Sequence, residues 1–178
     1  MSVRLFVALD LPQAALDALT AFRDAAADPD VWRPLDPLSF HVTLAFLGHR
    51  DEGDVATCVA ALSALPEPEP PPLALERALL LTRVLTVGLV DATGALARLQ
   101  AAVSVALVAA GVYEPEARPF RPHVTVARLR KDARPPGRVG LPRVEPLAFA
   151  GGPVVLYRSL PGRGGATYQP LWTRLAPG

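Results

Sequence analysis

Cysteine and long apolar runs are both scarce in this chain, and each absence excludes a class of protein. Cys58 is the only cysteine among 178 residues, so no intrachain disulfide forms and a zinc site built on cysteines is excluded. Charged residues or prolines interrupt every apolar stretch before it reaches the roughly eighteen residues that span a bilayer. The start, MSVRLFVALDLP, lacks the cleavage site of a signal peptide. We therefore expect a soluble cytoplasmic protein with one buried, inert thiol.

Net charge is small as well, but the positive charge is unevenly distributed. The formal net charge is +1. The segment 118–143 holds eight basic residues and one acid, a charge of +7, which leaves −6 for the rest of the chain. Such a segment is either a solvated arginine-rich loop or a rim that attracts phosphate. It contains one of the two motifs described next, and for that reason we favour the rim.

Histidine occurs only three times, yet two of the three stand in nearly the same motif. The two copies read FHVTLAFLG over residues 40–48 and RPHVTVARL over residues 121–129. Each copy follows a predicted strand and a predicted helix. The first of these strands begins 38 residues before His41 in one copy and 39 residues before His123 in the other. The matched spacing indicates an internal duplication.

The hydrophobic pattern predicts an α+β fold. Strands are expected over residues 3–9, 39–47, 73–81, 84–90, 122–129, 154–159 and 168–175. Helices are expected from Pro12, from Asp51 and over 95–110, the last ended by Gly111. The proline-rich segment 66–72 is predicted to be a stiff connector. We predict a single domain, residues 1–178, of two pseudo-symmetric duplicated lobes. Each lobe has an antiparallel-rich sheet with helices outside, and its H-x-T-x strand, at 41–44 or 123–126, flanks a central groove.

Side chains alternate across a strand, and this places the polar residues of both motifs on equivalent faces. In the first copy the core face is expected to carry four large apolar side chains, Phe40, Val42, Leu44 and Phe46. The opposite face carries His41 and Thr43, and in the second copy it carries His123 and Thr125. Half-exposed strands without chemistry are the alternative, which the duplication disfavours. The third histidine, His49, is expected in a surface turn.

Two imidazoles and two hydroxyls that face one another suit in-line displacement at phosphorus. A neutral histidine removes a proton from the attacking water, and a protonated histidine donates one to the leaving oxygen; both forms exist near pH 6.5. Threonine hydroxyls hold the non-bridging oxygens. A metal site fits less well, because neither motif places a carboxylate, cysteine or second histidine on its inward face. A serine hydrolase lacks its G-x-S-x-G motif here.

The motifs and their flanks resemble the 2H phosphoesterase superfamily. The stretches RLFVALDLP, FHVTLAFLG, RPFRPHVTVAR and LYRSL are similar to its bacterial RNA 2',3'-cyclic phosphodiesterase branch, also called 2'-5' RNA ligase. The resemblance implies hydrolysis of a terminal 2',3'-cyclic phosphate to a 2'-phosphate with no metal or other cofactor. It implies that His41 is the proton donor and His123 the proton acceptor, roles that near-identical motifs cannot distinguish. Thr43 and Thr125 would hold the phosphate.

Further site residues are expected around this centre. The resemblance adds Arg128 to the phosphate site, whereas simple alternation puts Arg128 on the opposite face as a surface charge. Aromatic stacking is the expected means of binding a nucleoside, and Phe6, Trp32 and Tyr168 are candidates, with core packing as the alternative for each. Arg118 and Arg121 are candidates for steering RNA to the groove.

Three functions follow from these residues. The leading hypothesis is hydrolysis of cyclic phosphates on RNA ends or nucleosides. The same site could join RNA ends through a 2'-5' linkage, since microscopic reversibility permits it. A non-catalytic nucleotide- or RNA-binding module is the third, disfavoured because both histidines and both threonines are intact. We expect no membrane association and no obligate protein partner.

Overall fold

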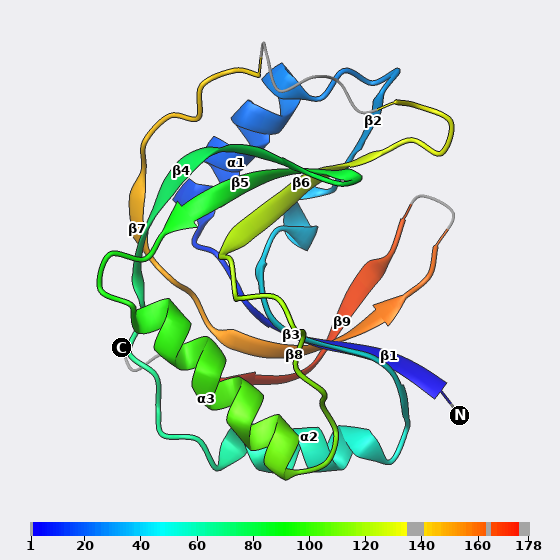
Figure 1. The fold of residues 1–178 in the computed structure, drawn as a ribbon, viewed down its shortest axis with the longest axis vertical. Helices are drawn as coiled ribbons and strands as arrows, with labels where there is room; N and C mark the ends of the chain where they lie inside the picture. The colour runs from blue at the N-terminus through cyan, green and yellow to red at the C-terminus, as the bar shows by residue number, and fades with distance from the viewer. Residues whose placement is uncertain (1, 135–140, 163–164, 175–178) are drawn as a thin grey trace.

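The computed structural model describes residues 2–134, 141–162 and 165–174, which form an antiparallel sheet and three α-helices (Figure 1). The helices are α1 (Gln13–Ala26), α2 (Asp54–Ser63) and α3 (Ala95–Ala109), with a 3-10 turn, η1 (Pro37–Ser39). The strands are β1 (Ser2–Leu9), β2 (Trp32–Pro34), β3 (Val42–Asp51), β4 (Pro72–Leu81), β5 (Val84–Val90), β6 (His123–Leu129), β7 (Ala148–Ala150), β8 (Val154–Leu160) and β9 (Thr167–Arg174). The predicted α+β class is confirmed. None of the helices in these ranges has the length and apolar character that a bilayer crossing requires.

The strands form one sheet that curves into a half-barrel, in the order β7-β4-β5-β6-β3-β1-β8-β9, with β2 paired to β6 (Figure 1). The two motif strands, β3 and β6, are neighbours in the middle of this order. Their pairing in the described structure is one position, Val42 opposite Val124. Farther out, β1 pairs with β3 and β5 pairs with β6 over most of their lengths. The two motifs therefore meet at the centre of the sheet.

The helices cross between the two repeated segments. Helix α1, from the first repeat, packs against β6 of the second, and α3, from the second repeat, packs against β3 of the first. Helix α2 lies beside α3 at the lower end of the view in Figure 1 and also contacts β9. Each repeat thus covers part of the other's sheet. Two pseudo-symmetric duplicated lobes remain a prediction, and the helix that precedes each motif packs against the strand of the other motif.

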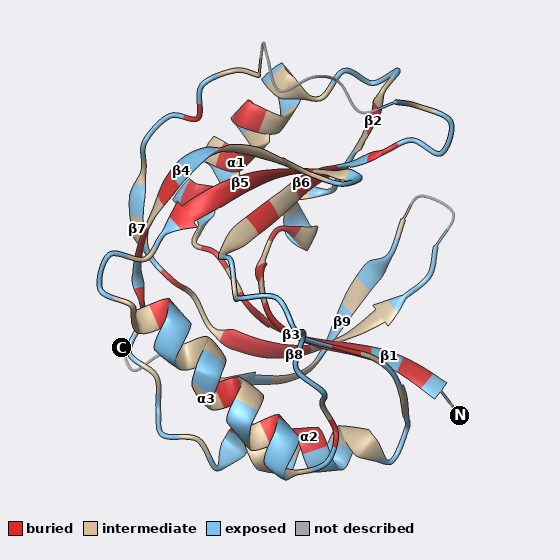
Figure 2. Cartoon of the chain, in the orientation of Figure 1, coloured by how far each residue is buried: buried red, intermediate tan, exposed pale blue. Residues whose placement is uncertain are grey.

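Each helix buries one face in the core (Figure 2). In α3 the buried residues are Leu96, Val103 and Leu107. Gly111, at φ 73°, ends the helix in the left-handed region that glycine tolerates best. Cys58 of α2 is fully buried, as predicted, and burial raises the pKa of its thiol to about 11. This cysteine is a core residue and not a nucleophile.

The structure differs from the sequence prediction around the first motif. Strand β3 begins at Val42 rather than at residue 39, because a 3-10 turn over Pro37–Ser39 precedes it. The Asp36 side chain caps this turn by accepting a hydrogen bond from the backbone N–H of Leu38. The strand then continues to Asp51. The predicted turn at His49 is therefore wrong: His49 is an exposed strand residue opposite Arg4. Strands β2 and β7 were not predicted, since three residues are too few to show alternation.

Candidate active site

A groove of about 590 Å³ receives polar side chains from both motifs. His41 and Thr43 line it from the β3 segment, and His123 and Thr125 line it from β6. Val42 and Val124, the residues between them, are buried on the opposite face of the sheet. The structure thus brings the four polar side chains together over the centre of the sheet.

The antiparallel register sets how these side chains face one another. Because Val42 lies opposite Val124, the residue before one valine corresponds to the residue after the other. His41 therefore corresponds to Thr125, and His123 corresponds to Thr43. Each imidazole stands across from the hydroxyl of the other motif.

The two imidazoles are held in the same tautomer by the same kind of contact. Nδ1 of His41 lies 2.7 Å from the carbonyl oxygen of Ser39, and Nδ1 of His123 lies 2.7 Å from the carbonyl oxygen of Arg121. A carbonyl only accepts, so Nδ1 carries the hydrogen in both rings. The second nitrogen, Nε2, is left in each ring for proton transfer.

The environments of the two histidines differ. Burial lowers the pKa of His41 to about 4, since desolvation disfavours the charged ring. The nearby positive charges of Arg128 and His123 act in the same direction, while the Ser39 carbonyl opposes them. At neutral pH the His41 ring is therefore uncharged in this environment, and its Nε2 is a proton acceptor.

An aromatic wall supports His41. The Phe6 ring stacks on the imidazole with centroids 4.9 Å apart and planes 29° apart, and Tyr168 meets the imidazole edge-on at 5.4 Å. Tyr157 stacks on Phe6 at 5.3 Å, and its hydroxyl donates to both carboxylate oxygens of Asp10, at 2.9 and 3.0 Å. Phe6 is 4% exposed. Its contacts are those of a residue that positions His41, with Tyr168 the more accessible of the two rings.

Each motif contains a β-bulge at its fourth residue. The pairing of β3 with β1 skips Leu44, and the pairing of β6 with β5 skips Val126. A bulge reverses the phase of the alternation beyond it. The prediction that Phe46 belongs to the core is therefore wrong: Phe46 is 42% exposed and lines the groove.

The bulge in the second motif, at Val126, decides the position of Arg128. Simple alternation puts Arg128 on the face opposite His123. Beyond the bulge Arg128 instead lines the groove, close enough for its charge to affect His41. The groove therefore holds a permanent cation beside its two imidazoles, which suits an anionic ligand.

Comparison with known proteins places this arrangement in a family. The model of the 2'-5' RNA ligase superfamily matches residues 10–159. The chain belongs to the 2'-5' RNA ligase superfamily. This membership confirms the resemblance stated from the motifs and supports an enzyme of phosphoester chemistry on RNA or nucleotides. No curated protein sequence matches the chain.

Several solved structures share this fold. E. coli LigT complexed with 3'-AMP has a TM-score of 0.83 and 26% identity, covering 99% of each chain. TT0787 of Thermus thermophilus has a TM-score of 0.77 and 26% identity, covering 97% of each chain. The MHV ns2 PDE domain, at 14% identity, shares the fold alone, with a TM-score of 0.59 over 87% of this chain and 99% of its own.

The other predicted residues fall into two groups. The prediction that Trp32 could stack on a base is wrong. Trp32 lies in β2, is 2% exposed and belongs to the core. Core packing was the alternative that the sequence left open for Trp32, and its burial supports that alternative. Arg118 and Arg121 are exposed but lie outside this groove, in a neighbouring hollow.

Sequence reasoning missed several residues of the groove. They include Arg4, Arg33, Asp36, Ser39 and Phe46. Phe46 had a signal, because it stands in its motif where Arg128 stands in the other. Arg4 had a weaker one: it is two residues from Phe6 in the same strand, so both side chains share a face. The remaining residues come from loops or strand ends, where no periodic pattern exists.

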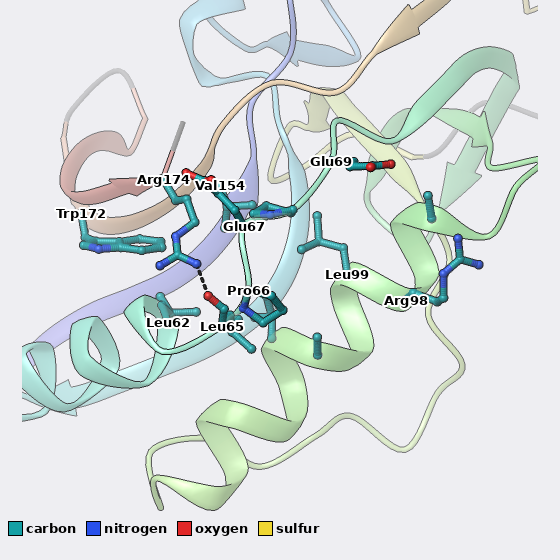
Figure 3. A pocket seen from close by; sticks show the side chains of 14 residues that line it. Leu62, Leu65, Pro66, Glu67, Glu69, Arg98, Leu99, Val154, Trp172 and Arg174 are labelled. Atoms are coloured by element: carbon teal, nitrogen blue, oxygen red, sulfur yellow. Dashed lines mark hydrogen bonds between the residues drawn. The ribbon is translucent and has the colours of Figure 1, made fainter. Parts of the chain in front are cut away.

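A separate cavity of about 320 Å³ shares no lining residue with the groove (Figure 3). It lies between α2, α3, the proline-rich connector and β9, and is lined largely by apolar side chains such as Leu62, Leu99 and Trp172. The Arg174 guanidinium donates to the carbonyl oxygens of Leu65 and Ser63 and lies over the Trp172 ring. Its cation is therefore occupied in fastening β9 to the end of α2.

Metal ligands do not gather anywhere in the described ranges. Within residues 2–134, 141–162 and 165–174, no three His, Cys, Asp or Glu side chains converge in a way that could hold an ion. Metal-independent chemistry remains a prediction, and the assay below tests it directly.

Proposed function

We propose that this chain hydrolyses 2',3'-cyclic phosphates, on RNA ends or on nucleosides, to 2'-phosphates without a metal ion. The observation that carries the proposal is the gathering of two imidazoles, two threonine hydroxyls and the Arg128 guanidinium around one groove. E. coli LigT, a structural neighbour, has been crystallised with 3'-AMP, with ATP and with phosphate. These ligands support a phosphate-bearing nucleotide as the occupant of the groove here.

The proposed reaction exchanges one phosphorus–oxygen bond for another. A water oxygen attacks phosphorus while the bond from phosphorus to O3' breaks, and the phosphate stays on O2'. One imidazole takes the proton of the water, and the other gives a proton to the departing O3'. Thr43 and Thr125 donate hydrogen bonds to the non-bridging oxygens, and Arg128 stabilises their charge.

The roles of the two histidines depend on the bound substrate. The pKa of His41 in the folded chain is about 4, so this ring is neutral at pH 7 before substrate arrives. A cyclic phosphate brings a negative charge between the strands, and a nearby negative charge favours the imidazolium form. We propose that substrate binding protonates His41, which then serves as the donor to O3', while His123 accepts the proton of the water.

The test is incubation with adenosine 2',3'-cyclic phosphate in the presence of a metal chelator, followed by chromatography of the products. Accumulation of adenosine 2'-phosphate supports the proposal. His41→Ala and His123→Ala are each expected to lower kcat by about 10²- to 10⁴-fold, the usual contribution of one proton transfer. His49→Ala is the matched control, because His49 is exposed on β3 outside the groove. Tight binding without turnover would instead indicate a binding module.

Joining of RNA ends is the same displacement with a 5'-hydroxyl in place of water. The superfamily carries this activity in its name, so the assay includes an RNA with a free 5'-hydroxyl. A product with a 2'-5' linkage would assign ligation to the same groove. A cytoplasmic location remains the prediction of the sequence.

A further inference from the structure

A second hollow opens beside the catalytic groove and shares part of its wall. Thr43, Phe46 and His123 line both. We call this hollow the outer compartment. Its volume of about 570 Å³ is close to the roughly 590 Å³ of the groove. A space of this size holds a small organic ligand. The groove and the outer compartment together therefore have room for two such ligands, one on each side of their shared wall.

The walls of the outer compartment come from segments that the catalytic site does not use. One is the segment between α3 and β6, which crosses the middle of the molecule in Figure 1. Another is the end of β4, at the turn into β5. These segments contribute Tyr113, Glu116, Arg118, Phe120, Arg121 and Leu81. The mixture of aromatic rings and cations is typical of sites for single-stranded nucleic acid.

The charge of the outer compartment is positive. Arg118 and Arg121 are exposed, and neither takes part in an ion pair within the described part of the chain. Glu116 is the one acid that lines the compartment. Two guanidinium groups against one carboxylate favour an anion such as a backbone phosphate.

Aromatic surface is available at the boundary and inside. Phe46 stands where the two hollows meet and is 42% exposed. Phe120 and Tyr113 are half-buried in the outer compartment. Stacking of a base on an aromatic side chain strengthens binding whichever base is present. The compartment therefore offers a face for a base next to donors for a phosphate.

The hollows continue away from the histidines as a basic track. A third hollow shares Leu80, Leu81 and Arg121 with the outer compartment and adds Arg77 and Arg143. Each of the three successive hollows thus carries arginine. In the third, Glu76 also lines the wall and pairs with Arg77 at 3.4 Å, so Arg143 is the cation that this hollow adds. A succession of cations spaced along a path suits a polymer of phosphates better than a single nucleotide.

We propose that the outer compartment binds the nucleotide that precedes the terminal cyclic phosphate. The chain would then act on RNA 3' ends of two or more nucleotides in preference to nucleoside 2',3'-cyclic phosphates. This inference rests on the proposed function, which fixes the cyclic phosphate between His41 and His123. The terminal nucleoside occupies the groove, and the backbone passes Phe46 towards Arg118 and Arg121.

The experiment compares kcat/KM for adenosine 2',3'-cyclic phosphate and for the dinucleotide ApA ending in the same cyclic phosphate. The ratio of the two values is the measured quantity, because any loss of folded enzyme cancels in it. Wild type is expected to prefer the dinucleotide by about tenfold or more, the value of one stacked base with a phosphate contact. The preference is expected to fall as salt is raised, because the phosphate contact is electrostatic.

The double variant Arg118→Gln/Arg121→Gln is expected to bring the ratio to within about threefold of unity, since most of the phosphate contact is gone. Arg98→Gln is the matched control: it removes an exposed arginine of α3 that lines neither hollow and should keep the wild-type ratio. A wild-type ratio near one, with both substrates hydrolysed, would overturn the inference and leave the proposed function intact. An unchanged ratio in the double variant would also overturn it. Hydrolysis of neither substrate would overturn both.

Discussion

Phe46 and Arg128 occupy the same position in the two motifs, and both side chains enter the groove because a bulge at the same place precedes each. Both strands have the same bulged backbone, but the side chain that enters the groove after the bulge differs between them. One strand presents an aromatic ring and the other a cation. This difference gives the two sides of the groove distinct surroundings in a site whose histidines and threonines are otherwise duplicated.

Arg128→Gln is expected to weaken catalysis and to change the titration of His41. Loss of charge-assisted hydrogen bonding of about 1.5–3 kcal/mol lowers kcat/KM by roughly tenfold to a hundredfold. The pKa of His41 should rise, because the charge of Arg128 is one cause of its depression. NMR titration of the imidazole measures this shift. Arg4→Gln is the control, since Arg4 lines the groove but is not among the causes of that depression.

The buried His41 should make stability depend on pH. Its pKa is about 4 in the folded chain and near 6.5 in an unfolded one. Between these values the unfolded state binds one more proton, so the free energy of unfolding falls as pH falls. The slope is at most about 1.4 kcal/mol per pH unit. Urea denaturation from pH 7 to pH 4.5 should show a flatter dependence for His41→Gln than for wild type. Equal slopes would contradict the burial of this ring.

Phe6→Leu is expected to lower kcat more than it alters KM. The substitution removes the ring that stacks on His41, and a misplaced catalytic group costs up to about a hundredfold in rate. Phe22→Leu supplies the control, because Phe22 is a buried residue of α1 that does not line the groove. Its substitution should lower the free energy of unfolding by a similar amount with kcat preserved. Matching kcat values for the two variants would remove Phe6 from its positioning role.

Tyr157→Phe should destabilise the protein in a pH-dependent way. The Tyr157 hydroxyl donates to Asp10, which lowers the pKa of that carboxyl against the larger effect of burial, which raises it. Without the hydroxyl the pKa of Asp10 rises further, so the ionised form costs more. The loss is expected to be about 1–3 kcal/mol at pH 7 and smaller at pH 4, where more of Asp10 is protonated. Denaturation at both pH values measures it, with Tyr168→Phe as the control.

The sequence predicts the frame of this site well. His41 and Thr43 share a face with each other, and His123 and Thr125 do the same, because regular alternation holds over the first three residues of each motif. The longer strands and all three helices also follow from periodicity. Their apolar side chains face the core and recur with the period of the helix or strand, so the sequence pattern reveals them.

The bulges could not be predicted. A bulge depends on the register against a neighbouring strand, and nothing within HVTLAF or HVTVAR marks Leu44 or Val126 as the skipped residue. The side chains that directly follow the skipped residue change face, which explains the error for Phe46 and the ambiguity for Arg128. The sequence left stacking and core packing both open for Trp32 for a related reason, since the short strand that buries it is fixed by pairing with β6 and not by its own pattern.

The single pairing of Val42 with Val124 also bears on how the protein acquires activity. The two residues are 82 positions apart and belong to strands that otherwise pair with different neighbours. Contacts between distant segments form late, because chain entropy must be lost before they contribute. The pairing of β1 with β8 joins residues still farther apart, such as Arg4 and Ser159, so the sheet around the motifs is complete only when several long-range contacts have formed. Recovery of turnover after dilution from denaturant should therefore coincide with the final step of folding.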